Sequence, residues 1–114
     1  GIGNKNPTYS LDVCGKIRAS QEIIVEANTW CDFVFDENYE LELFSERIEK
    51  IKLQKHLPNV LPEKVIMEQG IPMSETMQGI LQNVEELYLY MEKMENRILQ
   101  LEEENRKLRE EIQN

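Results

Sequence analysis

The sequence predicts an α+β fold, with short N-terminal β-strands, a middle region of helix and loop, and a long C-terminal parallel coiled-coil helix. Two observations predict it. Apolar and polar residues alternate over much of residues 9–35, and an apolar heptad pattern runs through residues 74–114. We therefore divide the chain into a β-rich part (1–35), a helix–loop part (36–73) and a coiled-coil stalk (74–114).

The expected strands lie between Tyr9 and Phe35. The runs YSLDV and KIRA flank Cys14-Gly15, which is typical of a turn, and EIIVEA and WCDFVF follow. Their aromatic residues are expected to be core residues rather than a carbohydrate-binding platform; they are Trp30, Phe33 and Phe35.

The middle region is expected to hold one helix, in the stretch SERIEKIKLQKH, with Ser45 as its N-cap and Ile48 and Ile51 on its apolar side. Pro58 is expected to end this part. The residues from 59 to 73 contain further proline and glycine, which predicts irregular structure.

The stalk is expected to begin with Ser74 as its N-cap. Only Gly79 disfavours the helix beyond that point, at a cost of about 1 kcal/mol. Roughly forty residues at about 1.5 Å each give a rod of about 60 Å. A rod of that length needs a partner of its own kind, because an isolated helix is marginally stable in water.

The stalk carries a continuous apolar seam. With Val84 as position a of a heptad, alternating steps of three and four residues reach only apolar side chains and one asparagine. This pattern strongly predicts a coiled coil. The a and d residues, which we call the seam, are Val84, Leu87, Met91, Met94, Ile98, Leu101, Asn105, Leu108 and Ile112; Met73, Met77 and Ile80 extend it towards the N-terminus.

The positions beside the seam predict that the helices run parallel. In a parallel coiled coil position g faces position e of the next heptad on the neighbouring helix. Arg97 would then face Glu102, and Glu104 would face Arg109, so both interchain pairs have opposite signs. An antiparallel arrangement would not form these pairs.

The number of chains has two possible answers. Asn105 at position a is common in parallel dimers but also occurs in trimers. The stretch Arg97-Ile98-Leu99-Gln100-Leu101-Glu102 resembles a short trimerisation motif, in which the arginine stem covers the apolar layer and its head binds the neighbour's glutamate. We favour a homotrimer, with the dimer as the alternative.

The charge balance excludes several partners. With 22 acidic residues against 13 basic ones and a net charge of -9, the chain is not expected to bind nucleic acid or an anionic membrane surface. No apolar run approaches the roughly 20 residues of a membrane-spanning helix. The expected partner is therefore another copy of the same chain.

No pattern in the sequence predicts a catalytic, cofactor or metal site. His56 is the single histidine and is expected to anchor a loop. Asp36, Asn38 and Glu40 have the spacing of the first ligands of a calcium loop, but leucine stands where that loop needs glycine. The two cysteines, at positions 14 and 31, are expected to be free thiols, and a bridge stays open if the strands that carry them pair.

Several segments in order resemble a known kind of module: LDVCGKIRA, ANTWCDFVFDENYEL, KHLPNV, and EELYLY leading into the coiled coil. They are similar to the C-terminal module of tail-fibre-like proteins of Bacteroidetes and their phages, which is loosely related to the intramolecular chaperone (peptidase S74) domain. The resemblance implies a non-enzymatic structural module that trimerises and registers a fibrous protein on a cell surface or virion, outside the cell.

The same resemblance implies that the N-terminal strands intertwine in the trimer and that the three core aromatic residues fill the join to the helices. It also leaves two alternatives. The first is a self-cleaving S74-type chaperone, but the chain has no Ser-Asp dipeptide, where that family cuts, so a cut site is expected only before Gly1. The second is an adhesion tip that binds a surface glycan or receptor.

Overall fold

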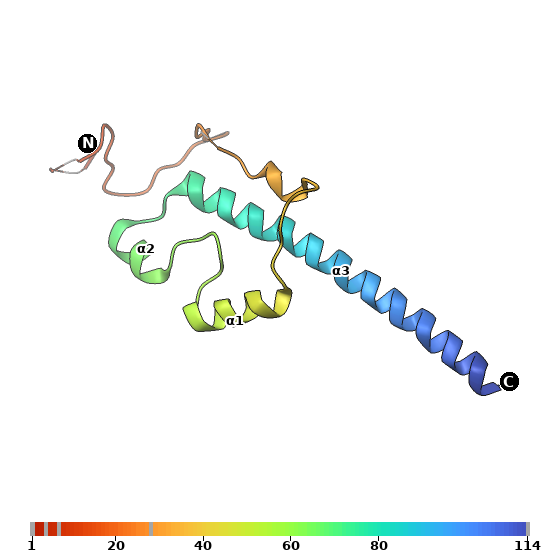
Figure 1. Cartoon of the computed structure of the whole chain (residues 1–114). Helices are drawn as coiled ribbons and strands as arrows, with labels where there is room; N and C mark the ends of the chain where they lie inside the picture. The colour runs from red at the N-terminus through yellow and green to blue at the C-terminus, as the bar shows by residue number, and fades with distance from the viewer. Residues whose placement is uncertain (1, 4, 7, 28, 114) are drawn as a thin grey trace.

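The protein is an elongated, mostly helical chain built around one long helix (Figure 1). The computed structural model describes residues 2–3, 5–6, 8–27 and 29–113. Its elements are the 3-10 helix η1 (Asp32–Phe35) and the helices α1 (Phe44–Gln54), α2 (Glu63–Gln69) and α3 (Met73–Gln113). The molecule measures 83 × 33 × 28 Å, and α3, at about 1.5 Å per residue, accounts for about 60 Å of its length.

The long helix expected from residue 74 is present as α3. It begins at Met73, where the amide of Thr76 donates to the carbonyl of Pro72 at 2.9 Å, so Ser74 lies inside the first turn and is not the N-cap. Gly79 does not interrupt it. None of the helices in the described part of the chain combines the length and the apolar composition needed to span a bilayer.

The middle region holds two helices rather than one. α1 begins at Phe44 with Leu43 as its N-cap residue, so the prediction that Ser45 caps it was wrong. α2 occupies a stretch where irregular structure was expected. The proline and glycine there lie at its ends: Pro62 precedes the first turn, which needs no amide from it, and Gly70 ends the helix with a φ of 85°.

The prediction of an α+β fold with N-terminal strands was wrong. Among the described residues the only β-type pairing is an isolated parallel bridge between Ile2 and Val13. The stretch WCDFVF contains η1 instead of a strand, and the residues from 9 to 27 form no regular element. Alternation alone does not make a strand, because each strand needs a neighbour to receive its hydrogen bonds and a core to cover one face.

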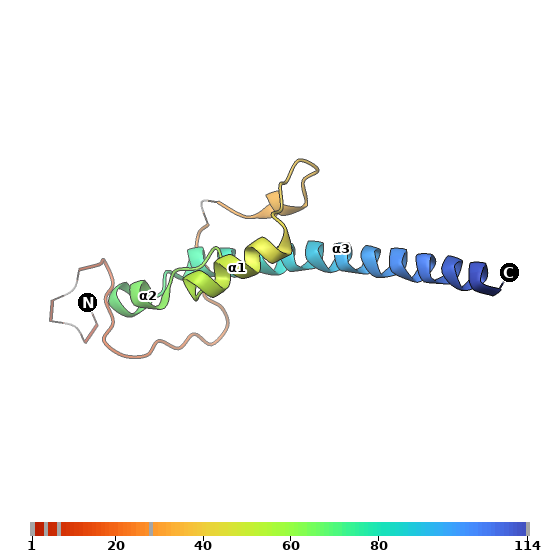
Figure 2. The same ribbon diagram turned by 60° about the horizontal axis from the view of Figure 1, so that its bottom comes forward.

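Residues 29–60, which we call the flanking segment, wrap around the N-terminal half of α3. In Figure 1, η1 and α1 lie on opposite sides of α3, and the chain between them crosses the helix. In Figure 2 η1 lies above α3, α1 overlaps it, and the C-terminal half of α3 projects alone. Every described residue from 91 to 113 is exposed.

Candidate functional site

The flanking segment holds α3 by its polar face. Glu86 of α3 is buried, with 1% of its surface exposed, and its carboxylate accepts hydrogen bonds from three side chains. The hydroxyl of Tyr39 donates to Oε1 at 2.6 Å, Gln82 Nε2 donates to the same oxygen at 3.0 Å, and Arg47 forms an ion pair with Oε2. A buried carboxylate is stable only when it is paired in this way.

A second layer surrounds Arg47. Its Nε donates to Glu42 at 2.9 Å, and Lys50 donates to the same carboxylate at 2.6 Å. The hydrogen bonds from Lys50 and Arg47 lower the pKa of Glu42. One turn beyond Glu86, the buried Tyr90 donates its hydroxyl to the carbonyl of Glu42 at 2.8 Å.

Tyr90 also makes the apolar contacts between α3 and α1. Its ring meets that of Phe44 edge to face, with centroids 5.0 Å apart, and the guanidinium of Arg47 lies 5.4 Å from the Tyr90 ring centroid. Burial raises the pKa of Tyr90, and burial followed by the hydrogen bond to Glu86 raises the pKa of Tyr39. Both phenols therefore stay protonated, as their donated hydrogen bonds require.

Gly79 lets the loop after α1 approach α3 closely. A Cβ atom at this position would lie 1.9 Å from the carbonyl oxygen of Asn59. Next to it, Asn83 Nδ2 donates to the carbonyl of Pro58 at 2.7 Å and its Oδ1 accepts from Asn59 Nδ2 at 2.9 Å. Gly79 is thus required by packing in the middle of a helix that it would otherwise weaken.

The other side of α3 is held by the residues around η1. Thr29 donates to Gln78 at 3.2 Å, and the buried thiol of Cys31 lies 4.0 Å from the Glu85 carboxylate. Burial first and Glu85 second raise the pKa of Cys31, so it is a poor nucleophile. Cys14 is exposed, and the two cysteines are not bonded to each other.

All these contacts lie away from the seam. Gly79 and Glu86 occupy position c, Gln82 position f, Asn83 and Tyr90 position g, and Gln78 and Glu85 position b. The seam residues are exposed along the whole helix, from 42% at Val84 to 83% at Ile112, and Asn105 is exposed as well. The chain therefore covers the polar face of α3 with its own residues and leaves the apolar face uncovered.

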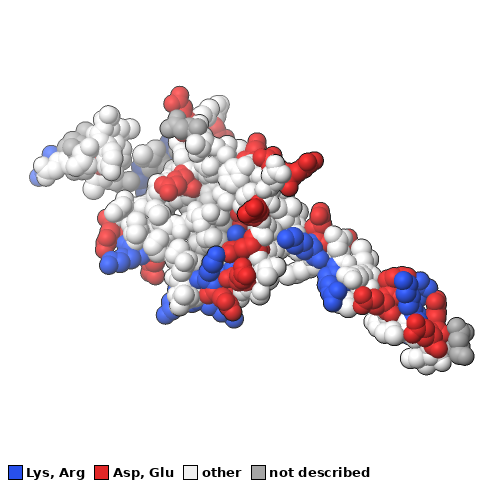
Figure 3. All heavy atoms as spheres, viewed as in Figure 1, with Lys and Arg blue, Asp and Glu red and all other residues white. Residues whose placement is uncertain are grey.

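The charged residues beside the seam are also without ion pairs inside the chain. Among the described residues, Arg97, Glu102, Glu104 and Arg109 make no salt bridge, although Arg97 donates to Gln100 at 3.1 Å. By contrast Arg106, at the outer position b, pairs within the helix with two glutamates at 2.5 Å. Figure 3 shows side chains of both signs over α1 and at the free end of α3.

The aromatic residues predicted as core lie at the surface of the single chain. Trp30, Phe33 and Phe35 are all more than two-fifths exposed, and the buried residues of their segment are Cys31 and Val34. Phe33 meets Tyr39 with ring centroids 5.7 Å apart. From the sequence these three aromatic side chains were expected in the core, and in the single chain the buried side chains beside them are smaller.

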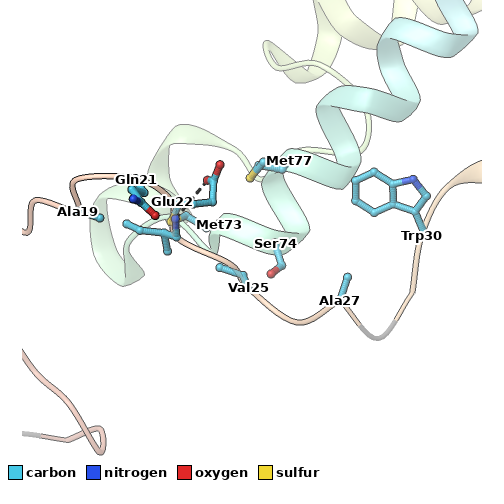
Figure 4. A pocket seen from close by; sticks show the side chains of 10 residues that line it. Ala19, Gln21, Glu22, Val25, Ala27, Trp30, Met73, Ser74 and Met77 are labelled. Atoms are coloured by element: carbon cyan, nitrogen blue, oxygen red, sulfur yellow. Dashed lines mark hydrogen bonds between the residues drawn. The ribbon is translucent and has the colours of Figure 1, made fainter.

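A cavity of about 540 Å³ lies between residues 19–30 and the start of α3 (Figure 4). Trp30 and Met77 lie at one end of it, and Glu22 turns back to accept a hydrogen bond from the amide of Ile23 at 3.2 Å. Its lining is mostly apolar. It contains no set of convergent polar groups that would orient a ligand, so it does not define a binding site.

The remaining candidates do not form a chemical site. The ring of His56 contacts the carbonyl of Leu57 at 2.9 Å, within its own loop. Over the part of the chain that the structure describes, no three histidine, cysteine or acidic side chains are placed to hold a metal ion, so Asp36 and Glu40 belong to no such group; Asn38 lies between them in the sequence.

The cluster around Glu86 was not predicted from the sequence. Its members come from distant stretches, and nothing local in SERIEKIKLQKH indicates that Arg47 is paired with α3. One signal was present: Gly79, Asn83, Glu86 and Tyr90 recur at helical spacing on one face. A glycine and a tyrosine on the same outward face of a coiled-coil helix suggest that this face is covered.

Comparison with protein-family models, curated proteins and solved structures found no significant match to this chain. The function must therefore be argued from the two faces of α3.

Proposed function

We propose that this chain is a non-enzymatic self-association module, in which α3 joins the α3 helices of two identical chains in a parallel coiled coil. One observation carries the proposal. The flanking segment packs on positions b, c, f and g of α3, and the a and d positions stay exposed from Val84 to Ile112. Monomeric proteins rarely expose an apolar stripe of this length.

The free end of α3 supports the same conclusion. From residue 91 to residue 113 every described residue is exposed, so packing within the chain contributes little to the stability of this stretch. Most helical stability in proteins comes from packing of an apolar face rather than from the helix propensity of the residues. A second and third copy of α3 supply that packing.

The charges beside the seam support a parallel trimer. Arg97 and Glu104 at position g, and Glu102 and Arg109 at position e, have no ion-pair partner in their own chain among the described residues. In a parallel coil each g residue meets an e residue of opposite sign. The arginine-to-glutamate motif at residues 97–102 favours three chains, and Asn105 then fixes the register.

The resemblance to tail-fibre-like proteins extends this proposal. A parallel trimeric coil brings three chains together in one register and raises the effective concentration of whatever is joined to them. In a fibrous surface or virion protein that is the step needed before the chains can associate along their length. The module would then act as a trimerisation and registration device, and its partner is itself.

The test compares two leucines that are almost equally exposed in the single chain, Leu101 in the seam at 43% and Leu99 at the outer position b at 54%. Leu101→Asp should abolish association, because it places one charge from each chain in the same apolar layer of the coil. Leu99→Asp should leave it intact. Light scattering gives the mass of each variant, and circular dichroism checks its helix content.

A trimeric mass for the unchanged chain and for Leu99→Asp, with loss of the trimer only in Leu101→Asp, is the expected result. A monomer at all micromolar concentrations for the unchanged chain would contradict the proposal. A dimeric mass would retain the seam and contradict the number of chains.

A further inference from the structure

The seam has two different edges at the level of Met94. On the edge of position e, a groove runs between Phe35 of η1 and Tyr88, Met91, Met94 and Ile98 of α3. On the edge of position g, a second groove runs between Leu43 and Phe44 of the flanking segment and Met94 and Arg97 of α3. Both grooves reach Met94, so they lie at the same height along the helix.

Each edge has an exposed apolar side chain contributed by the flanking segment. Phe35 is 58% exposed on one edge, and Leu43 is 64% exposed on the other. They line separate grooves on the two edges, and in the view of Figure 1 η1 and α1 lie on opposite sides of α3. Nothing in the described part of the chain covers either of them fully.

The charges of the two edges are complementary. Glu92 and Glu95 lie on the wall of the groove beside Phe35, and Lys93 and Arg97 lie on the wall of the groove beside Leu43. No salt bridge within the described residues uses any of these four side chains. One edge is thus apolar and acidic, and the other is apolar and basic.

We propose that the two edges bind each other between copies, so that Phe35 of one chain packs beside Leu43 of the next and the flanking segments form a closed ring around the coil. This inference rests on the proposed parallel association. In a parallel coil the e edge of one helix faces the g edge of its neighbour at nearly the same height. Two unlike edges on every copy make a head-to-tail contact, which a symmetric ring satisfies completely.

An antiparallel orientation would not bring these two edges together. In an antiparallel pair the e edge of one helix faces the e edge of its partner, so the groove beside Phe35 would not meet the groove beside Leu43. The contact between unlike edges therefore requires the parallel orientation.

Cross-linking of chains with one exposed cysteine tests this contact directly. The full chain is prepared with Cys14→Ser, which removes the exposed thiol and leaves the buried Cys31 in place, and carries either Phe35→Cys or Leu43→Cys. The two variants are mixed, unfolded, refolded together and treated with a short bis-maleimide cross-linker. A covalent dimer should form in the mixture and be absent, or nearly so, in either variant alone.

Two further variants serve as controls. Leu53 lies near the end of α1, the helix that begins directly after Leu43, and is 83% exposed. A chain with Leu53→Cys should therefore give no cross-linked product with Phe35→Cys. Glu95→Cys with Leu43→Cys probes the same contact from α3, and this pair tests the inference if Phe35→Cys does not fold.

The outcomes separate the two proposals. A trimeric mass without cross-linking in either test mixture overturns the ring and leaves the coiled coil in place. Products from Phe35→Cys alone mean that like edges meet, which also overturns the ring. A monomeric mass overturns the proposed association, and the ring with it.

Discussion

At the scale of single residues, one of the most buried side chains among the described residues is a carboxylate, that of Glu86. Glu86 is as buried as Val34, although this chain exposes most of its large apolar side chains. Its three hydrogen-bond donors come from the flanking segment and from its own helix. Because a carboxylate is tolerated there only in one orientation, Glu86 fixes how α3 is rotated about its axis relative to the flanking segment.

Replacing Gly79 by alanine should destabilise the folded chain, although alanine has the higher helix propensity. Gly79→Ala would favour an isolated helix by about 1 kcal/mol. In the folded chain the new Cβ would collide with the backbone of Asn59, and overpacking of this kind typically costs about 1–3 kcal/mol. We expect a lower thermal unfolding midpoint by circular dichroism. Asn96→Ala, at an exposed outward position of the same helix, should raise it slightly.

Equal stabilisation by the alanine substitutions at 79 and 96 would contradict the close approach of the loop. Both substitutions raise the helix propensity of their position, so an opposite effect on stability must come from the contact of residue 79 with Asn59.

At the scale of elements, α3 was predictable and the N-terminal part was not. The heptad pattern is a local property of the sequence, and it located a helix that the structure has from Met73 to Gln113. A strand depends on a distant partner. The alternation of residues 9–13 therefore indicated a strand that the described chain does not form, apart from one bridge at Val13.

The candidate site likewise has a part that could be predicted from the sequence and a part that could not. The seam and its e and g charges could be identified from spacing alone, because one helix carries them all. The contacts of Glu86 with Tyr39 and Arg47 could not, because they join residues far apart in the sequence. The side chains that flank the seam, Phe35 and Leu43, likewise become neighbours of α3 only through the path of the flanking segment.

Charge exchange along α3 is the element-scale prediction. Arg97→Glu should lower the unfolding midpoint of the assembly, because it sets two negative charges opposite each other in each interchain pair. Adding Glu102→Arg should restore it, since exposed pairs of opposite sign contribute about 0.2–1 kcal/mol each. Thermal unfolding at fixed chain concentration gives both values.

Arg106→Glu is the matched control for that exchange. Arg106 is paired with Glu103 and Glu110 within its own helix, so its reversal should also weaken the helix a little. Glu102→Arg should not repair that loss. Restoration of both variants by Glu102→Arg would mean that the effect is one of net charge rather than of a specific pair.

At the scale of the whole molecule, the chain is too extended for a self-contained domain. Its radius of gyration is 22.5 Å, whereas a compact chain of this length has about 13 Å. The C-terminal half of α3, which projects alone, contributes to this large radius. The buried residues among those described lie where the flanking segment meets α3. The two halves of the molecule therefore depend on different contacts.

Hydrogen exchange should separate these two halves. Amides of residues 99–113 should be protected only where chains are associated, because every described residue there is exposed in the single chain. On dilution they should lose protection before the amides of α1, which the contacts around Arg47 hold within one chain. Mass spectrometry of peptides over a series of chain concentrations measures both. Protection of residues 99–113 that does not change with concentration in a monomeric sample would contradict this.

α3 both receives the flanking segment on one face and carries the seam on another, and this affects the chain during its synthesis. Residues 36–47 leave the ribosome before Glu86 and Tyr90, and at about 5–20 residues per second the interval is on the order of 3–10 s. A nascent chain that stops in this interval lacks both the surface that receives its flanking segment and most of the seam. Under the proposed association such a chain has no complete seam to pair with finished chains, so we expect incomplete products to be left out of the assembly.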